Sequence, residues 1–135
     1  MKPFQLDSSM TTMGGVFYPT GYMVLMFPTR DDVEQAARLL QDGGINADDV
    51  SMLTPQVIQE QIVRSVGSAD IPLPSAGTEA DTVRRFAEYA SQGHHALMVH
   101  APSGDDGDRV MELLKGAPIS YGQKYRKLVI EDIEG

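Results

Sequence analysis

The chain has 135 residues, and its 19 acidic and 11 basic side chains give a formal net charge of −8 at pH 7. This length fits one domain, which can bury about two thirds of its unfolded surface and needs no metal or disulfide to fold. The sequence has no cysteine, which excludes disulfide frameworks, zinc–thiolate sites and thiol catalysis. The acidic balance argues against a general binder of nucleic acid or anionic membrane, because affinity for phosphate rests on Lys and Arg.

The chain carries no pattern typical of membrane insertion or export. Its longest uninterrupted apolar run, residues 22–27, is far shorter than the roughly 20 residues of a membrane-spanning helix. Residues 1–7 have no apolar core of signal-peptide length. We therefore expect a cytoplasmic protein.

Residues 1–20 are expected to form an N-terminal arm, followed by one domain over residues 21–135. The arm combines flexible glycines with three adjacent apolar side chains, Val16, Phe17 and Tyr18. These side chains gain free energy by leaving water, so we expect the arm to dock on the body of the protein. A disordered terminus is the alternative. The sequence leaves open whether the arm covers its own sheet or that of a neighbouring subunit.

The first half of the domain has the pattern strand, helix, strand. Residues 22–27 predict a strand closed by Pro28. Thr29 is expected to cap the next helix, with Asp32 as its capping-box partner. The helix continues to Gly43-Gly44 through apolar residues at i, i+3, i+4 and i+7, namely Val33, Ala36, Ala37 and Leu40. Residues 50–53 predict the second strand.

A helical insertion is expected over about residues 54–92. Thr54-Pro55 is typical of the N-cap and first position of a helix, and Thr78 is expected to cap a second helix. Residues 67–77, between the two helices, contain Gly, Ser and Pro and predict a loop. This loop is long enough to be a lid or a partner-binding segment, and a simple connector is the equal alternative.

The last third predicts a strand over residues 95–100, a helix capped by Ser103 with Asp106, and a final strand over about 125–133. Residues 117–121 could pair as a short piece before that strand.

One structural unit is expected to occur twice. The matching positions are Gly21, Leu25-Met26, Pro28, Asp31-Asp32 and Leu39-Leu40 against Gly93, Leu97-Met98, Pro102, Asp105-Asp106 and Leu113-Leu114. Two β-α-β units in series give the α+β, ferredoxin-like plan β-α-β-β-α-β, with a four-stranded antiparallel sheet and helices on one face. The helical insertion lies between its second and third strands. Chance similarity of amphipathic segments is the alternative.

The strand region 93–101, the acidic helix start after it and the ending over residues 125–132 are similar to small bacterial proteins of the general-stress type. These form the YflT-like, heat-induced stress domain group. The resemblance implies an α+β fold and an association with stress, and it supplies no active-site residues.

The strands are apolar at consecutive positions, as in residues 22–27 and 96–99. A sheet that faces water on one side alternates apolar and polar residues, so these strands predict cover on both faces. The N-terminal arm, an inserted helix or a second subunit could supply that cover. We favour a homodimer closed across the open face, with the arm contributing.

The histidines are His94, His95 and His100. On a strand, His94 and His100 share a face about 20 Å apart, too far to share a metal ion.

Acidic pairs such as Asp31-Asp32 fall in first helical turns, where carboxylates cap amide groups. Lys124, Arg126 and Lys127, with Tyr121 and Tyr125, form the one basic and aromatic cluster. Such a cluster can bind single-stranded nucleic acid. The exposed, solvated edge of a β-strand explains it better. No phosphate-binding or nucleophile motif is present, so we expect no cofactor and no metal.

Two functional hypotheses follow. The first is a non-enzymatic, oligomerising domain that acts through protein–protein interaction or small-ligand binding at the sheet interface. Its expected contact residues are Val16, Phe17, Tyr18, Met23, Leu25, His95, Met98, His100 and Tyr125. The second is a small enzyme of the dimeric α/β-barrel type, acting on an organic substrate between two sheets, with His95, His100, Tyr22 and Tyr125 as candidates.

Overall fold

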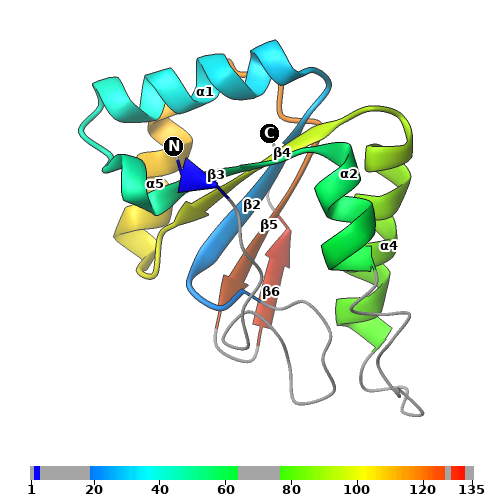
Figure 1. Ribbon diagram of the computed structural model, residues 1–135. Helices are drawn as coiled ribbons and strands as arrows, with labels where there is room; N and C mark the ends of the chain where they lie inside the picture. Colours follow the sequence, from blue (N-terminus) through cyan, green and yellow to red (C-terminus); the bar gives the residue numbers. More distant parts are fainter. Residues whose placement is uncertain (1, 4–18, 64–76, 127–128, 133–135) are drawn as a thin grey trace.

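The computed structural model describes residues 2–3, 19–63, 77–126 and 129–132 (Figure 1). They form a six-stranded sheet with the order β1-β3-β4-β2-β5-β6. The strands are β1 (Lys2–Pro3), β2 (Tyr22–Phe27), β3 (Val50–Leu53), β4 (His95–His100), β5 (Tyr121–Arg126) and β6 (Val129–Asp132). The helical elements are α1 (Arg30–Asp42), η2 (Ala47–Asp49), α2 (Pro55–Val57), η3 (Ile58–Val63), α4 (Gly77–Ser91) and α5 (Gly104–Leu113).

Strands β3, β4, β2 and β5 are antiparallel to one another in this order, and β6 continues the pattern beside β5. Only the two-residue β1 runs parallel to its neighbour, β3. The α+β class predicted from the sequence is therefore confirmed. In the part of the chain that is described, no helix is both long and apolar enough to cross a membrane.

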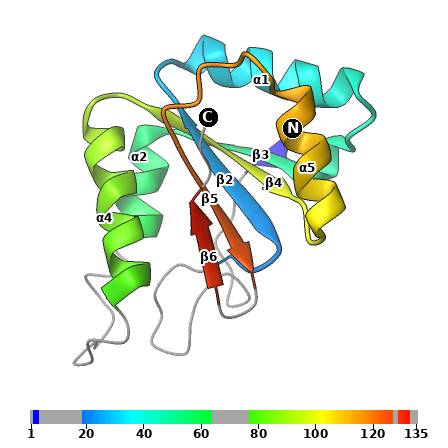
Figure 2. The same ribbon diagram turned by 180° about the vertical axis from the view of Figure 1, so that it is seen from behind.

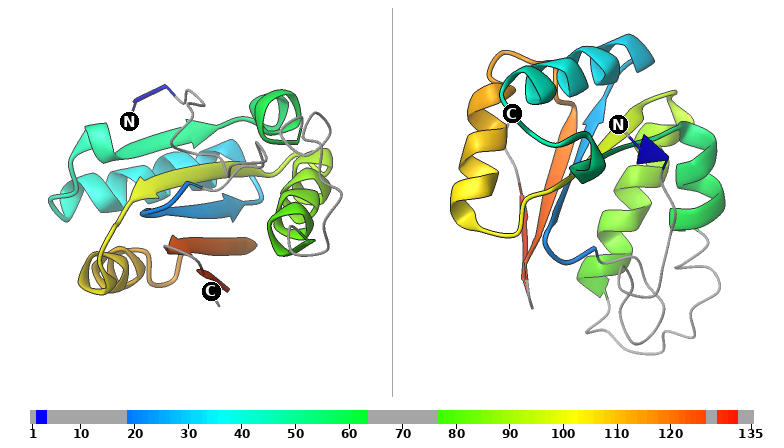
Figure 3. Two further views of the ribbon diagram at one scale, coloured as in Figure 1. Left: turned by 90° about the horizontal axis from the view of Figure 1, so that it is seen from below. Right: turned by 60° about the vertical axis from the view of Figure 1, so that its left-hand side comes forward.

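Helices cover both faces of the sheet, which corrects the expectation of helices on one face. Helices α1 and α5 pack on the face that carries Met23, Leu25 and Phe27. Elements α2, η3 and α4 pack on the opposite face, which carries Val24 and Met26 (Figure 3). The consecutive apolar positions of β2 and β4 are explained by these two cores. The cover predicted for the second face is supplied at least in part by the inserted helices, and the homodimer stays a prediction.

The predicted repeat corresponds to equivalent elements, β2–α1 and β4–α5. The matching Leu25 and Leu97 are direct partners in the antiparallel register of β2 and β4. The matching Gly21 and Gly93 both precede a strand with positive φ, at 84° and 88°. Leu25 and Leu97 therefore occupy matching positions in the two central strands.

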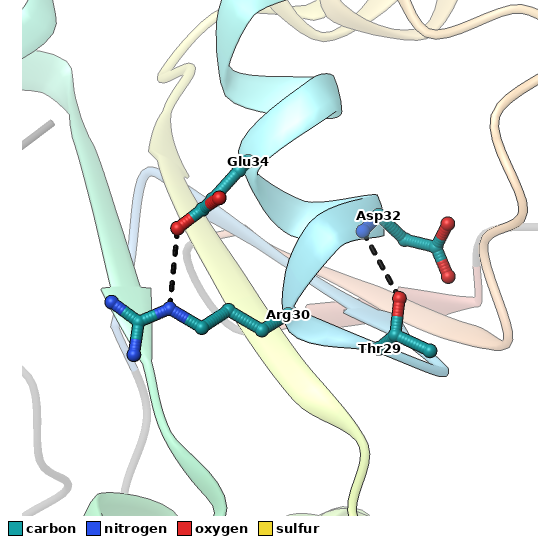
Figure 4. A network of polar contacts seen from close by, with 4 residues as sticks. All are labelled: Thr29, Arg30, Asp32 and Glu34. Atoms are coloured by element: carbon teal, nitrogen blue, oxygen red, sulfur yellow. Dashed lines mark hydrogen bonds and ion pairs between the residues drawn. The ribbon is translucent and has the colours of Figure 1, made fainter.

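Side-chain caps start the helices where the sequence places them. The hydroxyl oxygens of Thr29, Thr54 and Ser103 each accept a hydrogen bond from the backbone N–H three residues later. Figure 4 shows this bond at Thr29. The reciprocal bond of a capping box is present at Ser103. Thr78, expected to be a cap, lies inside α4, which begins at Gly77.

The C-terminal strand prediction was wrong in its extent. Instead of one strand over about 125–133, the chain forms the antiparallel pair β5 and β6. Strand β5 begins at Tyr121, and residues 117–120 form no strand. The hydrophobic pattern did not predict the start of β5, because the middle of this strand lacks the apolar side chains of the other central strands. Its middle residues are Gly122, Gln123 and Lys124.

Helix α1 ends in a Schellman motif, and the motif places Ile45 against the core. Gly44, with a φ of 92°, donates to the carbonyl of Gln41, and Ile45 donates to that of Leu40. Gly43 faces α5, where a β-carbon would overlap the side chain of Leu113. Gly43 therefore permits the close approach of α1 and α5.

Replacing Gly43 by Ala is expected to lower the free energy of unfolding by about 1 kcal/mol, because the added methyl group displaces the half-buried end of the Leu113 side chain. In a Leu113→Ala background the same substitution should be less destabilising, since the overlapping side chain is gone. Urea denaturation measures both effects. Gly104→Ala is the matched control, because no atom lies within 4 Å of its β-carbon position. Equal losses at Gly43 in both backgrounds would contradict the packing argument.

Candidate functional site

The predicted contact residues are dispersed over the molecule. Val16, Phe17 and Tyr18 lie outside the described residues, as does the loop at 67–77 apart from Gly77. Met23, Leu25 and Met98 are at most 1% exposed and pack in the two cores of the chain itself. They could touch a ligand or a second subunit only if a helical layer moved away from the sheet.

The predicted histidines do not share a site. His95 is opposite Phe27 on the α1–α5 side of the sheet, and its Nδ1 lies 3.1 Å from the carbonyl oxygen of Gly93. His100 is opposite Tyr22 on the other side, with ring centroids 4.9 Å apart. Its Nδ1 lies 3.8 Å from Oδ1 of Asp49, and both side chains are more than 40% exposed. Such an exposed pair contributes little to stability.

Of the basic residues predicted to cluster at the last strand, Lys124 is the one whose side chain the structure describes. Lys124 extends to the start of α5, where its Nζ donates to the carbonyl oxygen of Ser103 at 3.2 Å. Tyr125 and Arg126 lie in β5, and their side chains are outside the described part of the structure, as is Lys127.

Sequence reasoning missed an aromatic cluster made by Phe86 and Tyr89 of α4 with His94 and Tyr121. The Tyr89 and Tyr121 rings are stacked with centroids 5.4 Å apart. Phe86 packs edge-on against Tyr121, and Tyr89 lies 5.2 Å from His94. Through these ring contacts, α4 packs against the start of β5.

Polar groups surround this aromatic cluster. His94 Nδ1 and Ser120 Oγ are joined by a hydrogen bond of 2.8 Å, and the Gln123 amide donates to the Tyr121 hydroxyl at 2.7 Å. A Ser–His pair resembles part of a nucleophile–base arrangement. No carboxylate orients His94 among the residues described, and no group of acidic or histidine side chains there could hold a metal ion.

A groove of about 250 Å³ lies between α1 and the start of β3. It is lined by Glu34, Ala37, Arg38, Gln41, Ile45, Ala47 and Val50, which we call the α1–β3 groove. Its four residues from α1 are spaced i, i+3, i+4 and i+7, so they share one helical face. The Schellman motif places Ile45 on the core, and β3 begins at Val50. Apolar side chains therefore form the base of the groove, and polar groups from α1 form its rim.

The rim carries two charged side chains, Glu34 and Arg38, and they differ in their partners. Glu34 pairs with Arg30, one turn earlier, through an Oε1–Nε distance of 3.2 Å (Figure 4). Arg38, one turn later, has no ion-pair partner among the described residues. A second groove, of about 230 Å³, lies between α1 and residues 115–118 and includes the exposed Leu39.

Comparison of the chain with family models, with curated proteins and with solved structures gave no match.

Replacing Tyr121 by Phe is expected to lower the free energy of unfolding by about 1–3 kcal/mol, because the Gln123 amide, which is buried, loses a hydrogen-bond acceptor. Tyr89→Phe is the matched control: it makes the same chemical change in the stacked partner, whose hydroxyl has no hydrogen bond within the described residues. Thermal and urea denaturation compare the two variants. Equal stabilities would contradict a structural role for the Tyr121 hydroxyl.

Proposed function

We propose that this chain is a ligand-binding domain with a ferredoxin-like centre, and that the α1–β3 groove holds a small organic molecule. The ferredoxin-like assignment is supported by the chain order β2–α1–β3–β4–α5–β5 and by the antiparallel pairing of these strands. The self-association, cytoplasmic location and stress association expected from the sequence belong to this proposal as predictions.

The observation that carries the proposal is the composition of the groove. Binding sites for small molecules are concave and mostly apolar, with a few polar groups that fix orientation. The α1–β3 groove combines apolar Ala37, Ile45 and Val50 with polar Glu34, Arg38 and Gln41. Its volume of about 250 Å³ is just below the roughly 300–1,000 Å³ of sites for drug-sized ligands. A ligand of smaller size is therefore expected.

The alternative of a dimeric barrel-type enzyme is less well supported. Such an enzyme needs an open sheet face that a second sheet can approach, with its reacting groups between the two. In this chain α2, η3 and α4 pack on the face that would have to be open. The candidates His95 and His100 lie on opposite faces.

The binding function can be tested by ligand-observed NMR with a mixture of acids, amines and alcohols of four to eight carbon atoms. At least one compound is expected to bind the unmodified protein. Ala37→Leu should remove that binding, because the larger side chain fills the groove. Ala87→Leu is the matched control, since Ala87 is also a half-buried alanine in a long helix but lies on the other side of the sheet.

Circular dichroism confirms that both variants are folded before binding is compared. Native mass spectrometry of the same samples reports the subunit number and any retained ligand. Absence of binding to every compound, or equal binding by the two variants, would contradict the proposed site.

A further inference from the structure

We propose that the α1–β3 groove selects a small monocarboxylate with an apolar body, and that Arg38 binds its carboxylate. This inference rests on the proposed binding function and names the ligand class. Three features of the groove carry it: the unpaired guanidinium of the rim, the donor groups of α1 and the apolar base.

The pairing of the charged groups favours an anion. Glu34 and Arg38 are the charged residues of the groove lining, so the lining carries no net charge. Glu34 is already paired with Arg30 through their 3.2 Å contact. No carboxylate among the described residues lies within ion-pair distance of Arg38, so its guanidinium is the charged group left for a ligand.

The donor groups fit a carboxylate in particular. Arg38 and Gln41 are three residues apart on α1, so their side chains share one face of the helix. A guanidinium presents parallel N–H donors that match the two oxygens of a carboxylate, and charge-assisted bonds of this kind are about twice as strong as neutral ones. The Gln41 amide adds an N–H donor beside it.

The base of the groove selects the other end of the ligand. Ala37, Ile45 and Val50 present only hydrocarbon, and Ile45 and Val50 belong to the core on this side of the sheet. Each methylene that a ligand buries there is expected to tighten binding about fourfold. Nucleotides and sugar phosphates fit poorly, because one guanidinium and an apolar base do not match a polyanion.

Isothermal titration with three compounds of the same carbon skeleton tests the inference: isocaproate, isohexanol and isohexylamine. Isocaproate is expected to bind about tenfold more tightly than the alcohol, and the amine more weakly than either. Raising the salt concentration should weaken the binding of isocaproate and leave that of the alcohol unchanged.

The Arg38→Gln variant tests the carboxylate contact separately from the apolar contact. It should weaken isocaproate about tenfold and leave the alcohol unchanged, because the apolar base is intact. Arg85→Gln is the matched control: it removes the same charge from an exposed residue on α4, across the sheet, and should change neither. Binding of the amine or alcohol as tight as that of the acid, or an unchanged acid affinity in Arg38→Gln, would overturn the carboxylate inference. It would leave the binding function standing, whereas absence of all binding in the broader mixture would refute both.

Discussion

The pairing of β2 with β4 at the centre of the sheet is the interaction on which the rest of the structure depends. Leu25 and Leu97 are opposite one another and fully buried. Each strand starts a strand–helix unit, and the antiparallel pairing brings α1 and α5 to the same face of the sheet. Because both strands are apolar on both faces, this arrangement is stable only when a second layer covers the other side.

The inserted segment supplies that layer. Ile58 of η3 and Val83, Phe86 and Ala90 of α4 pack on the side chains of β2 and β4 that point away from α1. The chain thus covers within one subunit a face that a simpler β-α-β-β-α-β domain would leave bare. The apolar strands therefore do not by themselves require a covering subunit, and the homodimer stays a prediction.

The sequence was sufficient for features that depend on local chemistry. Thr29, Thr54 and Ser103 predicted helix starts because a hydroxyl three residues before a free N–H is a local arrangement. The repeat predicted equivalent elements because Gly21 and Gly93 both take a positive φ shortly before a strand, although they belong to different turns. Strand β5 was misplaced because its polar middle residues are held by pairing with β2, a contact that the local pattern does not contain.

The side-chain contacts of the candidate sites were less predictable, because they join residues that are far apart in the sequence. His94 and Ser120 are 26 residues apart, and the sequence around either residue does not predict their hydrogen bond. The face of α1 made by Glu34, Ala37, Arg38 and Gln41 was visible as helical spacing. The groove forms only because the Schellman motif and strand β3 bring Ile45 and Val50 beside this face.

Helix α1 therefore has two adjacent faces with different roles. Val33, Ala36 and Leu40 hold it on the sheet, and the neighbouring positions one residue later line the groove. Ala37 and Ile45 contact both, since they line the groove and pack against the core. A ligand that buries these side chains favours the state in which α1 and the start of β3 are in place, because binding to the native state alone stabilises it. Binding and the packing of α1 are for that reason expected to be thermodynamically linked.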